Sequence, residues 1–318
     1  MIYRQLGKTG LLVSRLCMGT LTLGPLQMNM TPSEGAGIIR YARECGVNFF
    51  DTAHIYGTYE HLRHAIGPHE TGVVIASRSY AYDADTMREH LELALRQTGR
   101  ERIEVFGLHE QESRLTLVGH REALEYLGRA KEQGKVGAVV VSTHYVDVAR
   151  ALAVMPEVDV VHALINMPGI GIRDGTAEDM AEALATLNRR GKGVYAMKAL
   201  GGGHLSSQNT QALAFVRDIS AIDAVAVGMA SSDEVLFNVA MFSGLEPPPG
   251  LEDELRSVRR RLVIEDWCNG CGDCARACPA RALSVLGGRA TVDDKACVLC
   301  GYCAQVCVGF CIKVLSVR

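Results

Sequence analysis

The chain has 318 residues, a formal net charge of −3 and 48% hydrophobic residues. A chain this close to neutral indicates neither nucleic acid nor an anionic membrane surface as a partner, and its apolar content is enough for a large core. The N-terminus lacks the apolar segment of a secretory signal, and no apolar run approaches the roughly 20 residues of a membrane helix. We therefore expect a cytoplasmic protein, long enough for one barrel-sized domain and a small module.

Residues 1–245 alternate between apolar, β-rich runs and stretches with helical spacing. The runs predict eight strands, at 15–20, 47–53, 72–78, 102–109, 135–143, 159–166, 193–200 and 224–230. The clearest helix start is Thr31-Pro32-Ser33-Glu34, a capping box with proline at the first helical position. Residues 85–97, 115–133 and 177–190 also have helical periodicity. Eight strand–helix units in about 230 residues predict a (β/α)₈ barrel.

An open doubly wound sheet is the alternative fold for this domain. Its fingerprint is a glycine-rich phosphate loop after the first strand. Here that strand leads into Gly19-Thr20-Leu21-Thr22-Leu23-Gly24, which does not match the fingerprint. Residues 2–14 predict a β-hairpin that turns at residues 7–10 and could close the bottom of a barrel.

The domain is followed by a linker and a cysteine-rich module. Residues 246–250 are Glu-Pro-Pro-Pro-Gly, a stiff linker, and residues 251–261 predict a connecting helix. The module spans 262–318, and nine of the eleven cysteines lie in its last 51 residues. A reducing cytosol favours metal binding over disulfides for these thiols. Cys17 and Cys45 stand alone and are interpreted as small hydrophobic residues.

The cysteines form two runs with the spacing C-x₂-C-x₂-C-x₃-C. In such pairs of runs three cysteines hold one [4Fe–4S] cluster and the fourth binds the other cluster. The predicted ligands are Cys268, Cys271, Cys274 and Cys307 for one cluster, and Cys297, Cys300, Cys303 and Cys278 for the second. Two zinc sites are the alternative, but zinc ribbons usually pair two cysteines at a time.

On these runs the module resembles the bacterial two-cluster ferredoxins over residues 262–318. Val308 stands where that family has proline, a departure that removes no ligand. Cys311 is an additional thiol, interpreted as a packing residue. The resemblance implies transfer of single electrons and a redox protein as partner.

The segment Asp51-Thr52-Ala53-His54-Ile55-Tyr56 follows the second predicted strand, at the end of a barrel where chemistry occurs. With Gly19-Thr20, Leu108-His109, Ser142 and the segment at Gly228, it makes residues 3–240 similar to the aldo-keto reductases. The resemblance implies that Tyr56 donates a proton to a substrate carbonyl, that Asp51 is part of its charge network and that His109 orients the substrate. The family's lysine falls on Arg78, which keeps the charge but cannot relay a proton.

The resemblance also implies NAD(P)H across the barrel mouth. Barrel loops after strands 7 and 8 often bind phosphate, and a serine at the start of the last helix would cap a helix end that can do the same. The expected contacts are Gly19, Thr20, Asp51, Ser142, Asn166, Met197, Lys198, Gly228, Ser231, Ser232 and Asn238. Asp233 and Glu234 would repel a 2′-phosphate. Met197 and His162 depart from the family's aromatic residue and glutamine.

These features predict an iron–sulfur oxidoreductase that reduces a carbonyl or a related unsaturated small molecule. The alternative is an electron-transfer or redox-sensing subunit whose barrel binds a cofactor or ligand without turnover. The reductant stays open between NAD(P)H and the clusters, because nicotinamide gives electron pairs and clusters give single electrons. Specificity would lie in loops 21–30, 110–118 and 167–176.

Overall fold

The barrel predicted from the strand–helix repeats is present. The computed structural model of the protein describes residues 1–299 and 301–316. Eight parallel strands close in the order β10-β3-β4-β5-β6-β7-β8-β9. The open-sheet alternative is wrong, because the first and last of these strands pair, with Gly19 opposite Gly228. The strands are β3 (Leu16–Gly19), β4 (Phe49–Asp51), β5 (Val74–Ser79), β6 (Ile103–Gln111), β7 (Val136–Thr143), β8 (Val160–Leu164), β9 (Gly193–Met197) and β10 (Ala224–Gly228).

Helices surround the barrel. They are α1 (Pro32–Glu44), α2 (Tyr59–Ala65), α3 (Ala84–Thr98), α4 (Arg114–Gly119), α5 (Arg121–Glu132), α6 (Val146–Leu152), α7 (Ala177–Arg189), α8 (Asn209–Arg217) and α9 (Ser232–Ser243), with short 3₁₀ turns η1 (His54–Tyr56), η2 (Gly201–Gly203) and η3 (Ser206–Gln208). Within the described ranges, no helix combines the length and apolarity that crossing a bilayer requires.

Local sequence signals explain where two of these helices begin and end. The capping box of α1 is confirmed: the Thr31 hydroxyl accepts from the Glu34 N–H, and the Glu34 carboxylate accepts from the Thr31 N–H. The single helix predicted at 115–133 is wrong, because α4 and α5 meet at His120. There the Thr116 carbonyl accepts from the His120 N–H at 3.0 Å and lies 2.7 Å from the His120 Nδ1.

The predicted N-terminal hairpin closes the bottom of the barrel. It consists of β1 (Tyr3–Gln5) and β2 (Leu12–Ser14), which pair antiparallel. Leu6 and Val13 are fully buried and join the core inside the barrel. Gly7 has φ +53°, and a Cβ on it would lie 2.2 Å from the backbone nitrogen of Gly193. With the bottom closed, the interior opens only at the carboxyl ends of the strands.

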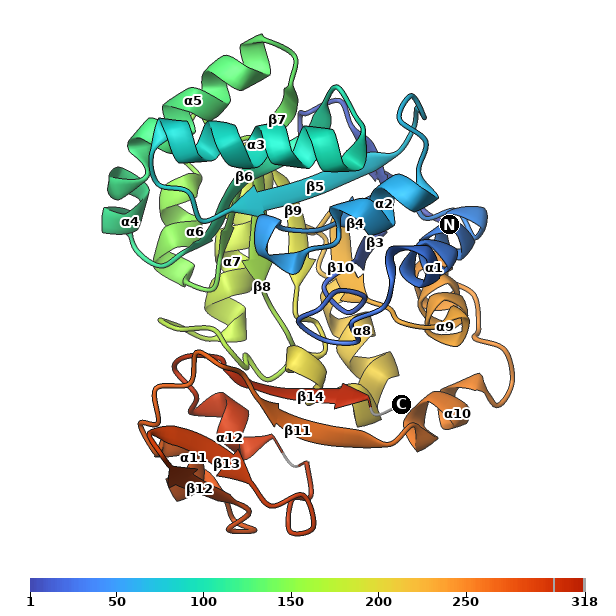
Figure 1. Ribbon diagram of the computed structural model, residues 1–318, viewed down its shortest axis with the longest axis vertical. Helices are drawn as coiled ribbons and strands as arrows, with labels where there is room; N and C mark the ends of the chain where they lie inside the picture. The colour runs from blue at the N-terminus through green and yellow to red at the C-terminus, as the bar shows by residue number, and fades with distance from the viewer. Residues whose placement is uncertain (300, 317–318) are drawn as a thin grey trace.

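The C-terminal module lies against that open end. In Figure 1, β11 (Arg260–Ile264) and β14 (Ile312–Ser316) lie between the barrel and the rest of the module, which contains α11 (Asp273–Ala277), β12 (Leu283–Leu286), β13 (Arg289–Val292) and α12 (Tyr302–Gln305). β11 pairs antiparallel with β14, and β12 with β13. The connecting helix α10 (Leu251–Ser257) is shorter than the predicted 251–261, because Arg260 and Arg261 pair with β14 as the start of a strand.

Candidate active site between the barrel and the cysteine module

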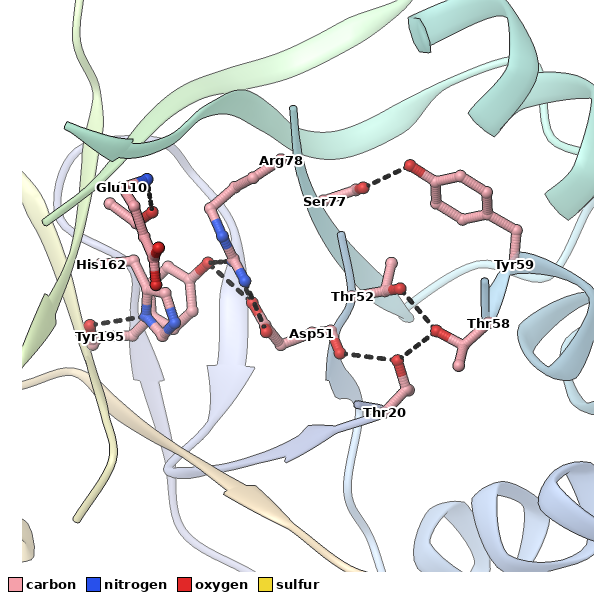
Figure 2. A network of polar contacts seen from close by, with 11 residues as sticks. Thr20, Asp51, Thr52, Thr58, Tyr59, Ser77, Arg78, Glu110, His162 and Tyr195 are labelled. Atoms are coloured by element: carbon pink, nitrogen blue, oxygen red, sulfur yellow. Dashed lines mark hydrogen bonds and ion pairs between the residues drawn. The ribbon is translucent and has the colours of Figure 1, made fainter. Parts of the chain in front are cut away.

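A buried network of three polar side chains lies at the barrel mouth (Figure 2). Asp51 ends β4, Arg78 lies on β5 and Tyr195 lies on β9. Both Nη atoms of Arg78 donate to the Asp51 carboxylate, with Nη2 at 2.9 Å from Oδ2. Arg78 Nη1 also donates to the Tyr195 hydroxyl at 2.8 Å, and that hydroxyl donates to Asp51 Oδ1 at 3.0 Å. The network therefore joins residues that are 144 positions apart in the sequence.

The network fixes the charge of Arg78. Burial opposes the charged guanidinium, but Asp51 and Tyr195 hold the pKa of Arg78 well above its usual value. Burial likewise raises the pKa of Tyr195. The Arg78 Nε has no hydrogen-bond partner among the described residues. Arg78 is thus a permanent cation whose two Nη groups are already committed to Asp51 and Tyr195.

Tyr56 and His109 lie beside this network and are both neutral at pH 7. The two rings meet edge to face, with centroids 5.8 Å apart. Burial raises the pKa of Tyr56 to about 12, although the charge of Arg78 works in the opposite direction. Burial, with the charge of Arg78, lowers the pKa of His109 to about 3. The Tyr56 hydroxyl therefore carries a proton to donate, and the His109 imidazole can hydrogen-bond a substrate oxygen without being charged.

Further polar side chains extend the site beyond His109. Tyr80 stacks on His109 at 4.4 Å and donates to the Glu110 carboxylate at 2.6 Å. Glu110 adopts a φ of +41°, a strained conformation for a residue with a side chain. The His144 Nε2 lies 3.3 Å from its carboxylate. Burial opposes ionisation of Glu110, but His144 and Lys198 hold its pKa below the usual value.

A cavity of about 700 Å³ connects these residues to the cysteine module. Part of this volume lies among the thiols, where a bound cluster would sit, so a small molecule would occupy the part on the barrel side. The barrel contributes Tyr56, Tyr80, His109, Glu110, His144 and Lys198 to the lining, and the module contributes Cys268, Cys271, Cys274, Cys307, Phe310 and Cys311. A small molecule in this cavity would contact the proton donor on one side and lie beside the thiols on the other.

The thiols predicted for the first cluster gather at this cavity. The pKa of Cys274 is raised by burial and then by the neighbouring thiols of Cys307, Cys268 and Cys271. The Cys268 thiol accepts a hydrogen bond from the Ala290 N–H at 3.4 Å. Soft thiols that accept backbone N–H groups are the donor set of a [4Fe–4S] cluster, so these residues fit the group.

Cys311 is buried in the apolar core of the module, in agreement with its interpretation as a packing residue. Its sulfur lies 3.3 Å from the sulfur of Cys307, and its N–H donates to the same Cys307 thiol at 3.4 Å. A fifth thiol therefore stands in direct contact with the predicted first ligand set.

The second predicted set lies within the core of the module. Cys303 is buried in that core, and Cys278 and Cys297 pack against it. The Cys278 thiol accepts from the Ala282 N–H at 3.3 Å. Cys300 is outside the described residues. The ten described cysteines form no disulfide with one another, and the described part of the chain contains no group of three or more side chains arranged for a single metal ion.

The residues expected to bind nicotinamide lie at the mouth, but several of their polar groups already have partners within the chain. The Ser142 hydroxyl accepts from the Glu110 N–H at 2.8 Å. The Asn166 carboxamide both donates to the Ile170 carbonyl and accepts from the Ile170 N–H, at 2.9 and 2.8 Å. The Thr20 hydroxyl donates to the Asp51 carbonyl at 3.0 Å.

Polar groups after the eighth barrel strand also form hydrogen bonds within the chain. Gly228 ends β10, and Ser231 caps α9 by accepting from the Glu234 N–H at 3.2 Å. The Glu234 carboxylate accepts from the Ala230 N–H, and Asn238 donates back to the Glu234 carbonyl. Ser232 is the first residue of α9. These bonds fix the segment between the end of β10 and the first turn of α9.

The arrangement can be compared with known proteins. A sequence model described as the aldo/keto reductase family matches residues 15–239, well over half of the chain. The chain belongs to the aldo/keto reductase family. A second model, described as a 4Fe-4S dicluster domain, matches residues 261–308. The protein is therefore an oxidoreductase of this family with an iron–sulfur domain at its C-terminus.

Relatives and solved structures agree with this membership. The uncharacterized oxidoreductase YrpG of Bacillus subtilis is 27% identical over 71% of this chain and 74% of its own length. The 6-dehydroglucose reductase of Novosphingobium aromaticivorans is 26% identical over 83% and 93%. The solved structure of PA4992 from Pseudomonas aeruginosa, described as an aldo-keto reductase, has a TM-score of 0.66 and 25% identity over 76% of this chain and 95% of its own. The TM-score and the coverage show that the two proteins share the barrel fold.

Sequence reasoning found Asp51, Tyr56, Arg78 and His109 and placed Glu110 in a loop expected to set specificity, but it missed three neighbours. Tyr195 is the central residue of a strand that is buried throughout. A tyrosine in such a strand needs a partner for its hydroxyl, and this could have indicated a buried polar network. Nothing in the sequence indicated that His144 and Phe310 would join the same cavity, since Phe310 comes from the other end of the chain.

Proposed function

We propose that this chain reduces a carbonyl or a related unsaturated small molecule at the barrel mouth, with single electrons from two [4Fe–4S] clusters. The observation that carries the proposal is the shared cavity, lined by Tyr56 and His109 on one side and by cysteine thiols on the other. When bound, the clusters would supply one-electron chemistry beside the substrate. Several of the contacts expected for NAD(P)H, the family's usual reductant, are already bonded within the chain.

The two ligand sets have different places in this proposal. Cys268, Cys271, Cys274 and Cys307 would hold the cluster that faces the substrate, because all four line the cavity. Cys297, Cys300, Cys303 and Cys278 would hold the second cluster. An external redox protein would supply electrons on that side of the module, since the mouth side is covered by the barrel.

The barrel residues would manage protons and orientation. Reduction of a carbonyl to an alcohol consumes two electrons and two protons. The neutral Tyr56 hydroxyl would donate one proton to the oxygen, and water in the cavity would supply the other. His109, uncharged, would orient the oxygen by a hydrogen bond. Arg78, fixed by Asp51, would stabilise the negative charge that develops near Tyr56 without relaying a proton.

A single-turnover experiment tests this function. The protein is purified without oxygen, its clusters are reduced, and excess reductant is removed. Carbonyl compounds are then added while cluster absorbance and alcohol formation are followed. Sugar aldehydes and ketones lead the panel, because 6-dehydroglucose reductase and L-galactose dehydrogenase are named among the relatives. We expect substrate-dependent reoxidation, with one alcohol formed for every two electrons.

Matched tyrosine variants assign the proton donor. Tyr56→Phe should slow reoxidation by about 10²-fold, a typical contribution of acid catalysis. Tyr59→Phe is the control, because Tyr59 is buried, bonds Ser77 (Figure 2) and is not among the residues that line the cavity. Equal rates in the two variants would remove Tyr56 from the mechanism.

The hydrogen bonds of Arg78 to Asp51 and Tyr195 favour a second candidate function. Both of its Nη groups bond Asp51 and Tyr195, so the charge next to Tyr56 is partly neutralised. In this second function the barrel binds a ligand without turnover, and the chain transfers electrons or senses the redox state. Clusters that stay reduced with every carbonyl tested would favour it over the reductase.

A further inference from the structure

The C-terminal module lies directly on the loop that follows the seventh barrel strand. A Cβ on Gly203, the last residue of η2, would lie only 2.1 Å from the carbonyl oxygen of Val314 in β14. The His204 Nε2 lies 3.4 Å from the Ile312 carbonyl oxygen of the same strand. The glycines of this loop thus permit the close approach of a strand of the same chain.

Phe310 extends this contact to the ends of β8 and β9. It is buried in a small apolar cluster with Leu164, Ile170, Met197 and Ala304. The Lys198 ammonium lies 4.3 Å from the centroid of the Phe310 ring, and the Lys313 ammonium lies 3.3 Å from it. Lys198 and Met197, two of the expected nicotinamide contacts, are therefore covered by a side chain of the module.

The loop after the eighth strand is open but carries the wrong charge. Gly228 is exposed there, as is Asp233 in the first turn of α9. The Ser231 hydroxyl accepts from the Glu234 N–H, and the Glu234 carboxylate accepts from the Ala230 N–H, so the Glu234 side chain is held at this helix end. A phosphate would meet the carboxylates of Asp233 and Glu234 here, and the basic side chain nearby is Arg260 of the module, whose charge already acts on Glu234.

Barrels of this class often bind phosphate with the loops after strands 7 and 8. In this chain the first loop is covered by β14 and Phe310, and the second is acidic. We infer that the C-terminal module and a nicotinamide dinucleotide are mutually exclusive occupants of this face, so that the assembled protein binds neither NADH nor NADPH. Its reductant is then a one-electron donor protein. This inference goes beyond the proposed function, because it concerns binding and holds whether or not a carbonyl is reduced.

The experiment is a titration of the cluster-loaded protein with NADH and with NADPH. Binding is followed by calorimetry and by amide hydrogen exchange of residues 198–205. We expect no saturable heat up to about 1 mM, the upper end of usual substrate affinities, and unchanged exchange of the loop. Saturable binding with slower exchange at 198–205 would overturn the inference, even if the clusters also reduced a substrate.

A pair of glycine variants tests whether the module covers the loop. Gly203 and Gly134 both have positive φ, at +94° and +78°, but nothing lies within 4 Å of a Cβ on Gly134. Gly203→Val should therefore displace β14 and speed exchange of residues 198–205 by at least about tenfold, whereas Gly134→Val, with similar backbone strain, should not. Equal exchange of the loop in the two variants would show that β14 does not cover it and would overturn the inference.

Discussion

The barrel mouth and the cysteine module place their reactive groups by different means. At the mouth, Asp51, Arg78 and Tyr195 come from three strands, and a large core positions them. In the module, most ligands of each predicted cluster are cysteines a few residues apart in the sequence, and three of them, Cys274, Cys303 and Cys307, also belong to the buried core. The site and the core of the module therefore share residues, whereas Asp51 and Arg78 at the mouth are polar groups placed by a core to which they do not belong.

The difference predicts which part of the molecule depends on iron. Removal of iron by a chelator without oxygen should unfold residues 260–316 and leave the barrel folded, because a module of this size rarely folds without its metal. Amide hydrogen exchange resolves the two regions in one experiment. Persistent protection of β11 and β14 in the iron-free protein would contradict the comparison.

The second prediction concerns the charge pair of the mouth. Arg78→Met leaves Asp51 buried without its partner and should lower the free energy of unfolding of the barrel by about 3–5 kcal/mol. Arg114→Met is the matched control, because Arg114 and Asp147 form an exposed pair whose loss should lower the free energy of unfolding far less. Urea unfolding measures both. Equal decreases in the free energy of unfolding would show that burial does not increase the contribution of the Arg78–Asp51 pair to stability.

The third prediction is an acid dependence of barrel stability. Burial lowers the pKa values of His109 and His144 to about 3. Between pH 6.5 and 3 the unfolded chain therefore binds protons that the folded chain does not, so stability falls as the pH falls. The loss should reach about 3 kcal/mol for each histidine at pH 4. Urea unfolding at pH 7, 5 and 4 measures how steeply the free energy of unfolding falls with pH. His144→Gln should make this fall less steep. An unchanged pH dependence in the variant would contradict the lowered pKa of His144.

The smallest expected effect separates Tyr195 from another buried tyrosine. Tyr195 bonds both Arg78 and Asp51, whereas Tyr59 bonds only Ser77 (Figure 2). Tyr195→Phe should cost about 2–3 kcal/mol, because it loses hydrogen bonds to charged groups, and Tyr59→Phe about 1 kcal/mol. Comparison of the two urea midpoints decides. A smaller cost at Tyr195 would mean that the network tolerates its absence.

The sequence by itself determined the features that depend on local patterns. The eight strands, the capping box at Thr31 and the hairpin were predictable, because each follows from residue spacing along a short segment. The cysteine spacing indicated an iron–sulfur module, and the segment from Asp51 to Tyr56 placed reactive side chains at the barrel mouth.

Only the tertiary structure decided which distant groups meet. Tyr195 joins Asp51 and Arg78 because barrel closure brings β9 near β4 and β5, and no local pattern records that contact. The break at His120 arises from a side chain that bonds its own helix end. The cavity shared by Tyr56 and Cys268, and the covering of Lys198 by Phe310, depend on how the module packs on the barrel. That packing is set by the shape of two surfaces, which the periodicity of either sequence segment does not contain.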